Sequence, residues 1–403
     1  MTKHKSSRHT HRTTHIFISP KLKSQMRTGH PWIYRDAIER APRDLPSGVW
    51  VRVQSANQQA IGLWDAEGPI AIRLFSAKNI PGAGWIKARV QEAWQRREPL
   101  RHPDHRTTAW RWIYGESDSI PGLVVDFYGD AESGKKWAVL KSYSPSLERI
   151  QKWVVDALKD ITPLNGIINR SGANWKLLAG APPADEIIIE ENGTRFAVDI
   201  LRGQKTGFFL DQRDNRQTVA RWSSGKRVLN LFSYTGGFSV AAALAGASQV
   251  TSVDSAPVAI TTAKRNFRIN NLNPADHGFE IADAFEMLER YHGEGNHFDL
   301  IVVDPPSFAR SKAQLTNALH AYRRLNALAM RCLGSNGILA TSSCTSQVSP
   351  TAFNAMLAEA AADARRRFII QHEAAQPLDH PVAAQFPEGR YLKFVLGEVA
   401  VLP

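Results

Sequence analysis

Short runs of alternating apolar and polar residues recur in the first eighty residues of the chain. They are VWVRVQ at 49–54, QAIGLW at 59–64 and IAIRLF at 70–75, with polar and glycine-containing turns between them. A period of two places the apolar side chains on one face of a strand. The pattern predicts a small β-domain with one face in water. Residues 85–97 instead space their apolar side chains at helical intervals, which predicts a helix.

A mixed pattern occupies residues 112–191. Strand-like runs are LVVDFY at 123–128, WAVLKSY at 137–143, GIINR at 166–170 and EIIIEE at 186–191, and 146–159 has helical spacing. Strands and helix mixed in this way predict an α+β domain.

From about residue 226 the pattern becomes a repeated order of strand, loop and helix. Five short β-rich runs, RVLNLF, QVTSVD, FEIAD, FDLIVVD and GILATSS, alternate with segments of helical composition such as 257–271 and 315–333. This alternation predicts a parallel sheet covered by helices on both faces. Ligands of such sheets bind beyond the carboxyl ends of the strands, so the residues directly after each strand are the candidates for chemistry.

The chain is therefore expected to be multidomain, which its 403 residues also require, because a single core of that size is unusual. The expected divisions are a basic disordered tail at 1–15, the small β-domain at 16–80, the α+β middle domain at 81–195 and the α/β domain at 196–403. No apolar run approaches the roughly 20 residues of a membrane helix. Two cysteines exclude a disulfide framework and favour a reducing cytoplasm.

The positive charge is concentrated near the N-terminus. The formal net charge is +12, and residues 1–35 contain eight Lys or Arg and no Asp or Glu. A basic segment of this kind favours a polyanionic partner such as nucleic acid, although a solvated tail at 1–15 explains part of it equally well. His9, His11 and His15 lack cysteine or carboxylate partners nearby, so no metal site is expected.

Glycines and carboxylates follow the first three predicted strands of the α/β domain. Gly236 and Gly237 follow the first strand, Asp254 ends the second, and Asp283 follows the third. Two glycines before a helix let the backbone approach a ligand, and a carboxylate after the second strand can bind ribose hydroxyls. Each is open to a plainer interpretation as a turn or a helix N-cap. Together they favour an adenosine-containing ligand.

The residues most typical of a catalytic site stand at the ends of the fourth and fifth predicted strands. DPPSF, at 304–308, stiffens a loop that carries a carboxylate and an aromatic ring, which suits a flat heterocycle. Cys344 lies in TSSCTS, among hydroxyl side chains, and such polar surroundings are expected to favour a reactive thiolate. The alternative is a passive pocket residue. Cys332, inside NALAMRCL, is expected to be core.

The series NLFSYTGGFS, SVDSA, ADAF, VVDPPSF and TSSCTS resembles the class I S-adenosylmethionine-dependent methyltransferases. More narrowly, the chain is similar to the bacterial ribosomal RNA cytosine-C5 methyltransferases of the RlmI type, which carry an N-terminal PUA domain. GHPWIYRDAI, GESDSIPGLVVDFYGD, GQKTGFFLDQRDNR and DHPVAAQFPEGRYLKFV also look like segments of that family, so the resemblance covers about 16–403. The extension at 1–15 has no counterpart in it.

The resemblance implies S-adenosyl-L-methionine as cofactor, ribosomal RNA as partner and a PUA-like N-terminal domain. It implies Cys344 and Asp304 as catalytic residues, with one cysteine only, because Pro306 stands where related families place a second. The residues implied at the cofactor are Phe232, Tyr234, Thr235, Gly236, Gly237, Asp254, Ser255, Asp283, Ala284 and Asp304. Those implied at the target base are Lys205, Thr206, Phe208, Asp211, Arg213, Pro305, Pro306 and Phe308; of Phe208 and Phe209, one is expected to be core.

Methylation of carbon 5 explains why a thiolate would be needed at Cys344. Carbon 5 of cytosine does not attack a sulfonium methyl unaided, and addition of sulfur to carbon 6 makes it nucleophilic. Two alternatives stay open: methylation of an exocyclic amine or guanine N7, and a non-catalytic RNA-binding assembly factor. Whether the working state is a homodimer also stays open. Hydride transfer is disfavoured, because G-x-G-x-x-G is missing after the first strand.

Overall fold

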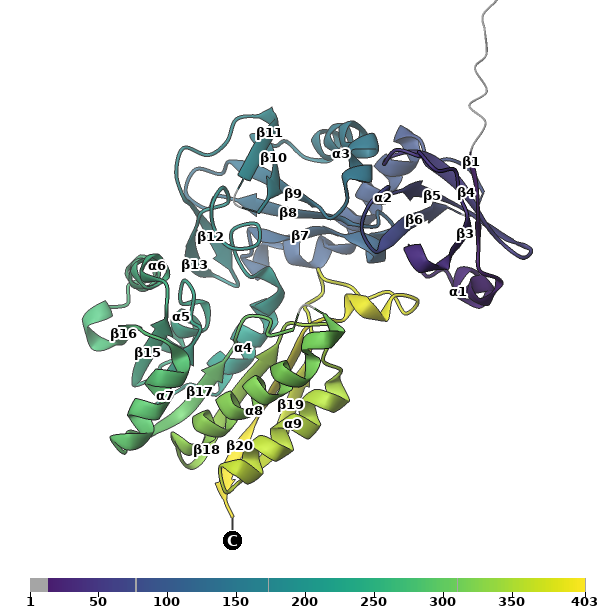
Figure 1. The fold of residues 1–403 in the computed structure, drawn as a ribbon. Helices are drawn as coiled ribbons and strands as arrows, with labels where there is room; N and C mark the ends of the chain where they lie inside the picture. Colours follow the sequence, from purple (N-terminus) through teal and green to yellow (C-terminus); the bar gives the residue numbers. More distant parts are fainter. Residues whose placement is uncertain (1–13, 77, 173, 310, 403) are drawn as a thin grey trace, which may run out of the picture.

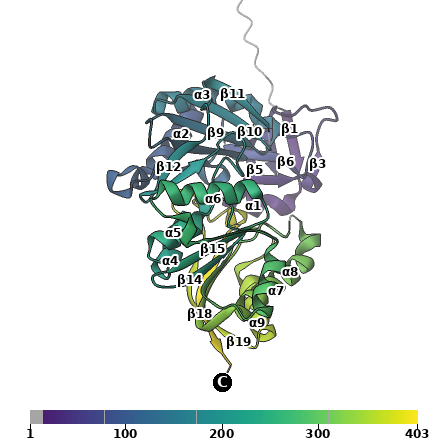
Figure 2. The ribbon, with the colours of Figure 1, turned by 90° about the vertical axis from the view of Figure 1, so that its left-hand side faces the viewer.

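Three sheets organise the chain, as Figures 1 and 2 show for a computed structural model that describes residues 14–76, 78–172, 174–309 and 311–402. The N-terminal sheet has the strand order β2-β6-β5-β4-β1-β3. Its elements are β1 Thr14–Ile18, α1 Lys23–Thr28, β2 Trp32–Tyr34, β3 Ile38–Arg40, β4 Trp50–Ser55, β5 Gln58–Trp64 and β6 Ile70–Ser76. Most of the tail predicted at 1–15 lies outside the described residues, but Thr14 and His15 already belong to β1.

The middle sheet has the order β11-β10-β9-β8-β7, and a separate hairpin of β12 and β13 follows it. Helices α2 and α3 pack on each other and on one face of this sheet. The elements are α2 Ala83–Arg96, β7 Ala109–Tyr114, β8 Leu123–Gly129, β9 Lys136–Ser142, α3 Glu148–Ile161, β10 Gly166–Ser171, β11 Asn174–Gly180, β12 Ile187–Glu191 and β13 Thr194–Val198.

The N-terminal and middle sheets share one apolar core. Trp50, Ile61 and Phe75 of the N-terminal sheet belong to the same buried cluster as Trp112 and Val154 of the middle domain. Removing the N-terminal sheet would therefore expose apolar surface at a cost of roughly 25 cal/mol per Å². The sequence predicted two separate units here and gave no sign of this shared core.

The C-terminal sheet has seven strands in the order β16-β15-β14-β17-β18-β20-β19, with only β20 antiparallel to its neighbours. Side chains of α4, α5 and α6 pack on one face, and those of α7, α8 and α9 pack on the other. The strands are β14 Arg227–Leu231, β15 Gln249–Asp254, β16 Gly278–Ile281, β17 Phe298–Val303, β18 Leu333–Ser343, β19 Arg366–Ala374 and β20 Lys393–Val401. The helices are α4 Arg213–Arg221, α5 Gly237–Leu244, α6 Pro257–Ile269, α7 Ala284–Gly293, α8 Leu315–Arg331 and α9 Pro350–Asp363.

The predicted fold class is confirmed: a parallel α/β domain follows an α+β region and a small β-domain. All five strands predicted after residue 226 are present, and their order reverses between β14 and β17. The strands that were not predicted are β1, β2, β3, β7, β11, β13, β19 and β20. Among the described residues, no helix combines the length and apolar character that crossing a membrane requires.

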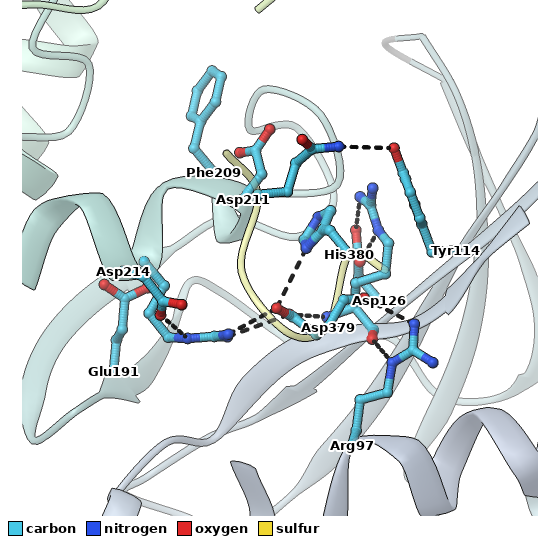
Figure 3. Close-up of polar contacts among 12 residues, drawn as sticks. Arg97, Tyr114, Asp126, Glu191, Phe209, Asp211, Asp214, Asp379 and His380 are labelled. Atoms are coloured by element: carbon cyan, nitrogen blue, oxygen red, sulfur yellow. Dashed lines mark hydrogen bonds and ion pairs between the residues drawn. The ribbon is translucent and has the colours of Figure 1, made fainter. Parts of the chain in front are cut away.

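A long connection between β19 and β20 ties the domains together. In Figure 1 this yellow segment leaves the C-terminal sheet and reaches the underside of the N-terminal sheet. Asp379 in this segment is fully buried and accepts hydrogen bonds from Arg213 Nη2 at 2.7 Å and from the Arg111 backbone N–H at 2.8 Å. Its own carbonyl accepts from Arg97 Nη2 at 2.8 Å. Figure 3 shows this junction between α4, the middle domain and the connection.

Candidate active site

The loop between β14 and α5 has a strained backbone. Phe232, Tyr234 and Gly236 all have left-handed φ angles, of 55°, 47° and 79°. Such conformations cost free energy for residues other than glycine and cluster at ligand-binding sites. A Cβ at position 236 would also lie 3.0 Å from Ala263 Cβ, so only glycine fits the close packing of this loop on α6. The loop thus exposes its backbone at the carboxyl edge of the sheet.

Carboxylates from the next two strands stand at the same edge, because β15 and β16 run parallel to β14 in neighbouring positions. Asp254 accepts hydrogen bonds from the backbone N–H groups of Tyr234 and Ala256, at 2.8 and 2.9 Å. Its carboxylate keeps lone pairs for a ligand. Asp283 caps α7 by accepting from Phe285 N and Glu286 N, so the plainer interpretation as an N-cap also holds.

These residues fit the adenosine part of S-adenosylmethionine. The hydroxyls of Ser233 and Thr235 are buried in the loop without a hydrogen-bond partner among the described residues. Buried polar groups of this kind normally bind water, an ion or a ligand. Ser255 and Asp283 are exposed, whereas the Ala284 side chain is buried at the start of α7.

Asp304 and Cys344 follow neighbouring parallel strands. The pairing of Val303 with Thr341 places the end of β17 beside the end of β18, as the sequence required. The Cys344 thiol lies 3.8 Å from the Pro305 carbonyl oxygen and points its proton at it. Asp304 accepts a hydrogen bond of 2.9 Å from Gln212 Nε2. A carboxyl group and a thiol therefore share one partly buried pocket.

The pKa of Cys344 in this pocket differs from what the sequence led us to expect. Burial, followed by the charge of Asp304, raises the pKa of the Cys344 thiol to about 11, and Lys205 opposes the shift. The expectation that the hydroxyl-rich surroundings favour a thiolate is therefore wrong for the free protein: Thr341, Ser342 and Ser343 are buried within β18 rather than arrayed around the sulfur. Burial and the charge of Asp211 also raise the pKa of Asp304, to about 6.

The segment 204–213 lies against this pocket. The Gln204 N–H donates to the Tyr234 hydroxyl at 3.0 Å, which joins the segment to the loop after β14. Lys205 pairs with the buried Asp211, and its Nζ lies 4.5 Å from the centroid of the Phe209 ring. Lys205 holds the pKa of Asp211 well below its usual range despite burial.

Of the residues implied at the target base, three are buried in the protein and a fourth, Phe308, is partly buried. Phe208 is 3% exposed in the core beside Phe196. Thr206 bonds the hydroxyl of Tyr128 at 2.9 Å, and Arg213 is paired with Asp379. Phe308 packs on Tyr322, 4.8 Å between ring centroids. Protein partners contact all four side chains in the structure, so the roles in RNA binding that the resemblance implies for them stay predictions.

The remaining residues of that set stay at the pocket. Lys205 and Asp211 line it as a pair, Pro305 is buried with its carbonyl toward Cys344, and Pro306 is exposed at the rim. Phe209, which is only partly buried, takes the place expected of Phe208. One of the two phenylalanines is thus core, as expected, and it is the other one that faces the pocket.

Three pocket residues were not found from the sequence. Gln212 holds Asp304, the Tyr391 hydroxyl donates to Asp211, and Lys393 donates from Nζ to the carbonyls of Thr345 and Tyr391. Lys393 pairs with Ser343 across β18 and β20, and burial lowers its pKa to about 8. All three stand in segments that carry the family resemblance: Gln212 in GQKTGFFLDQRDNR, and Tyr391 and Lys393 in DHPVAAQFPEGRYLKFV.

The strand order, the glycine loop and the carboxylates define a class I methyltransferase domain. The family model described as S-adenosylmethionine-dependent methyltransferase matches residues 161–384, and the PUA-like domain model matches 16–77. Curated relatives named ribosomal RNA large subunit methyltransferase I include those of Shewanella denitrificans and Aeromonas salmonicida. Both are 36% identical to this chain, over 95% and 93% of it and 99% and 96% of the relatives.

Solved structures agree on the fold. A SAM-dependent methyltransferase from Streptococcus mutans has a TM-score of 0.84 at 24% identity, covering 96% of this chain and 100% of its own. Another, SMU.776, was solved with SAH bound and has a TM-score of 0.85, with the same identity and coverage. The chain belongs to the S-adenosylmethionine-dependent methyltransferase family that includes these ribosomal RNA large subunit methyltransferase I relatives, and its cofactor is S-adenosylmethionine.

Proposed function

We propose that this protein methylates carbon 5 of a cytosine in large-subunit ribosomal RNA through a covalent adduct with Cys344. The names of the curated relatives support the RNA class. The observation that carries the finer proposal is the position of Cys344 beside Asp304, at the ends of the neighbouring strands β18 and β17. The target base would be extruded from the RNA to reach them.

The two side chains have complementary tasks. The Asp304 carboxylate accepts the thiol proton and passes it to ring nitrogen 3 while sulfur bonds carbon 6. The raised pKa of Asp304, about 6, suits a group that takes and gives a proton near neutral pH. Nitrogen 3 of cytosine accepts a hydrogen bond from such an acid, whereas that of uracil carries a hydrogen and would not.

The bound cofactor supplies an electrophilic methyl group on its sulfonium. Asp254, Thr235 and the loop after β14 would hold its adenosine part, and carbon 5 of the activated ring takes the methyl. A base then removes the proton from carbon 5, Cys344 leaves carbon 6 as a thiolate, and nitrogen 3 returns its proton through Asp304 to the sulfur. Gln212 orients Asp304 for these steps through its 2.9 Å hydrogen bond.

The base-nitrogen alternative finds less support in the pocket. It would use the loop of Asp304, Pro305 and Phe308 to stack a flat amine-bearing base, but the Phe308 ring packs on Tyr322. It also assigns no task to Cys344. The alternative of a non-catalytic RNA-binding factor would require neither the thiol nor its carboxylate neighbour.

A mechanism test uses RNA transcripts that contain 5-fluorocytosine. The wild-type protein should stall after methyl transfer, because fluorine cannot leave as a proton, and stay joined to the RNA through Cys344. Cys344→Ala should form no adduct and should not methylate unmodified RNA, yet bind S-adenosylmethionine normally. Cys332→Ala is the matched control, because Cys332 is fully buried in the core. Full methylation by Cys344→Ala would refute the thiolate mechanism.

A further inference from the structure

A cavity of about 790 Å³ lies where the three domains meet. Its wall comes from β6 and the turn before it, from β8, β9 and the end of β7 in the middle sheet, and from the connection before β20. In Figure 1 the yellow connection reaches beneath the purple N-terminal sheet, and Phe386, Glu388 and Gly389 of this connection line the cavity. Apart from Lys205 and Thr206, none of the residues that line it has a role in the reaction proposed above.

The wall is rich in aromatic rings. Trp32, Tyr114, Tyr143, Phe386 and Tyr391 line it. The rings of Trp32 and Phe386 lie 4.6 Å apart at an angle of 71°, which fixes both. Tyr143 is 60% exposed, and its ring is contacted by Lys141, whose Nζ lies 5.1 Å from the ring centroid. An exposed ring beside a cavity offers a face for stacking.

Most charges of the wall are already neutralised by protein groups. Arg73 pairs with Asp65, Arg111 donates to Asp126 at 2.8 Å, and Lys205 pairs with Asp211. Glu116 likewise accepts from Trp32 Nε1 at 2.7 Å. A cavity whose guanidinium groups are paired is a poor phosphate site. It suits flat, uncharged heterocycles.

One end of the cavity lies next to the candidate active site. Lys205 and Tyr391 line the cavity and both bond the same oxygen of Asp211. The charges of Lys205 and Asp211 in turn act on Asp304 and Cys344. A nucleotide held in the cavity would therefore be adjacent in the chain to the base undergoing reaction.

Basic side chains lie on α1 and on the turn before it, close in sequence to the cavity wall. Lys21, Lys23 and Arg27 are exposed on α1 and the turn before it, and none forms an ion pair within the described part of the chain. Four residues after α1 the chain enters the cavity wall at Trp32. Phosphates of an RNA strand could meet this helix while its bases turn inward.

We propose that this cavity binds unstacked nucleobases of single-stranded RNA next to the target nucleotide, with Tyr143 as a stacking platform. The proposal rests on RNA being the substrate. Single-stranded segments are the usual targets of base-specific RNA recognition, since their bases can splay onto aromatic side chains.

The test measures binding of fluorescent oligocytidylate hexamer to the full chain by anisotropy. Tyr143→Ala should weaken binding by roughly 5- to 150-fold, the range expected when one base stack is removed. Tyr143→Phe should restore it, because the ring suffices. Trp175→Ala is the matched control: Trp175 is 40% exposed on β11 and does not line the cavity. Thermal melting should show all variants folded.

Each outcome separates this proposal from the proposed reaction. Equal affinity of Tyr143→Ala and wild type, an equal loss of affinity in Trp175→Ala, or equally tight binding of a duplex of the same length would each overturn the cavity proposal. If Cys344→Ala still methylates RNA while Tyr143→Ala loses affinity, the thiolate mechanism fails and the cavity proposal stands.

Discussion

The ionisation of Cys344 gives the most direct physical test of the pocket. The structure raises the pKa of this thiol to about 11, with burial as the largest cause and Asp304 as the next. At pH 8 a thiol with a pKa of about 11 is ionised in roughly one molecule in a thousand, against about one in four for an unperturbed cysteine. Alkylation by iodoacetamide, which needs the thiolate, should be correspondingly slow.

The pH dependence separates ionisation from simple lack of access. Between pH 8 and pH 10 the alkylation rate of Cys344 should rise about a hundredfold, whereas that of an unperturbed thiol would rise only about fourfold. The measurement is made by mass spectrometry on Cys332→Ala, so that one thiol remains, with circular dichroism confirming the fold at each pH. A rate that levels off below about pH 9 would refute the electrostatic account.

Substitutions of two charged neighbours test the direction in which each charge shifts the pKa of Cys344. Asp304→Asn removes the negative charge that raises the thiol pKa, so alkylation at pH 8 should become faster. Lys205→Met removes a positive charge that lowers this pKa and should make alkylation slower. If the two variants moved the rate in the same direction, access rather than charge would control the thiol.

Three further predictions concern the cofactor, the RNA and the domain junction. Asp254→Ala should weaken S-adenosylmethionine binding in calorimetry without unfolding the protein, and unchanged affinity would remove Asp254 from the site. Replacing Lys23 and Arg27 by Ala should lower the salt slope of RNA binding by about 0.7 to 0.9 for each phosphate that the protein no longer neutralises; an unchanged slope would exclude α1 from the RNA surface. Asp379→Asn should lower the free energy of unfolding by about 3–5 kcal/mol in urea titrations, because it removes the buried counter-charge of Arg213 and leaves only its 3.3 Å ion pair with the exposed Asp214. Since that pairing depresses the pKa of Asp379, its stabilisation is present above the ordinary carboxyl pKa and is lost as the pH falls below it; a neutral effect of the substitution would refute this.

The sequence by itself determined the α/β architecture and the edge at which the chemistry lies. Strand, loop and helix alternate with clear periods after residue 226, and parallel strands bring their carboxyl ends to one edge whatever their order. Asp254, Asp304 and Cys344 could therefore be placed before any coordinates. The glycines of the loop after β14 could also be recognised from the sequence, because left-handed backbone and close packing select glycine.

Only the tertiary structure decided which side chains face the pocket. Phe208 and Phe209 are identical neighbours, and packing against Phe196 alone sends the first into the core. Lys393 and Tyr391 reach the pocket because β20 inserts antiparallel beside β18, a long-range pairing that no local pattern encodes. The raised pKa of the thiol follows from burial, which depends on the whole fold, and the cavity at Tyr143 exists only where three domains meet.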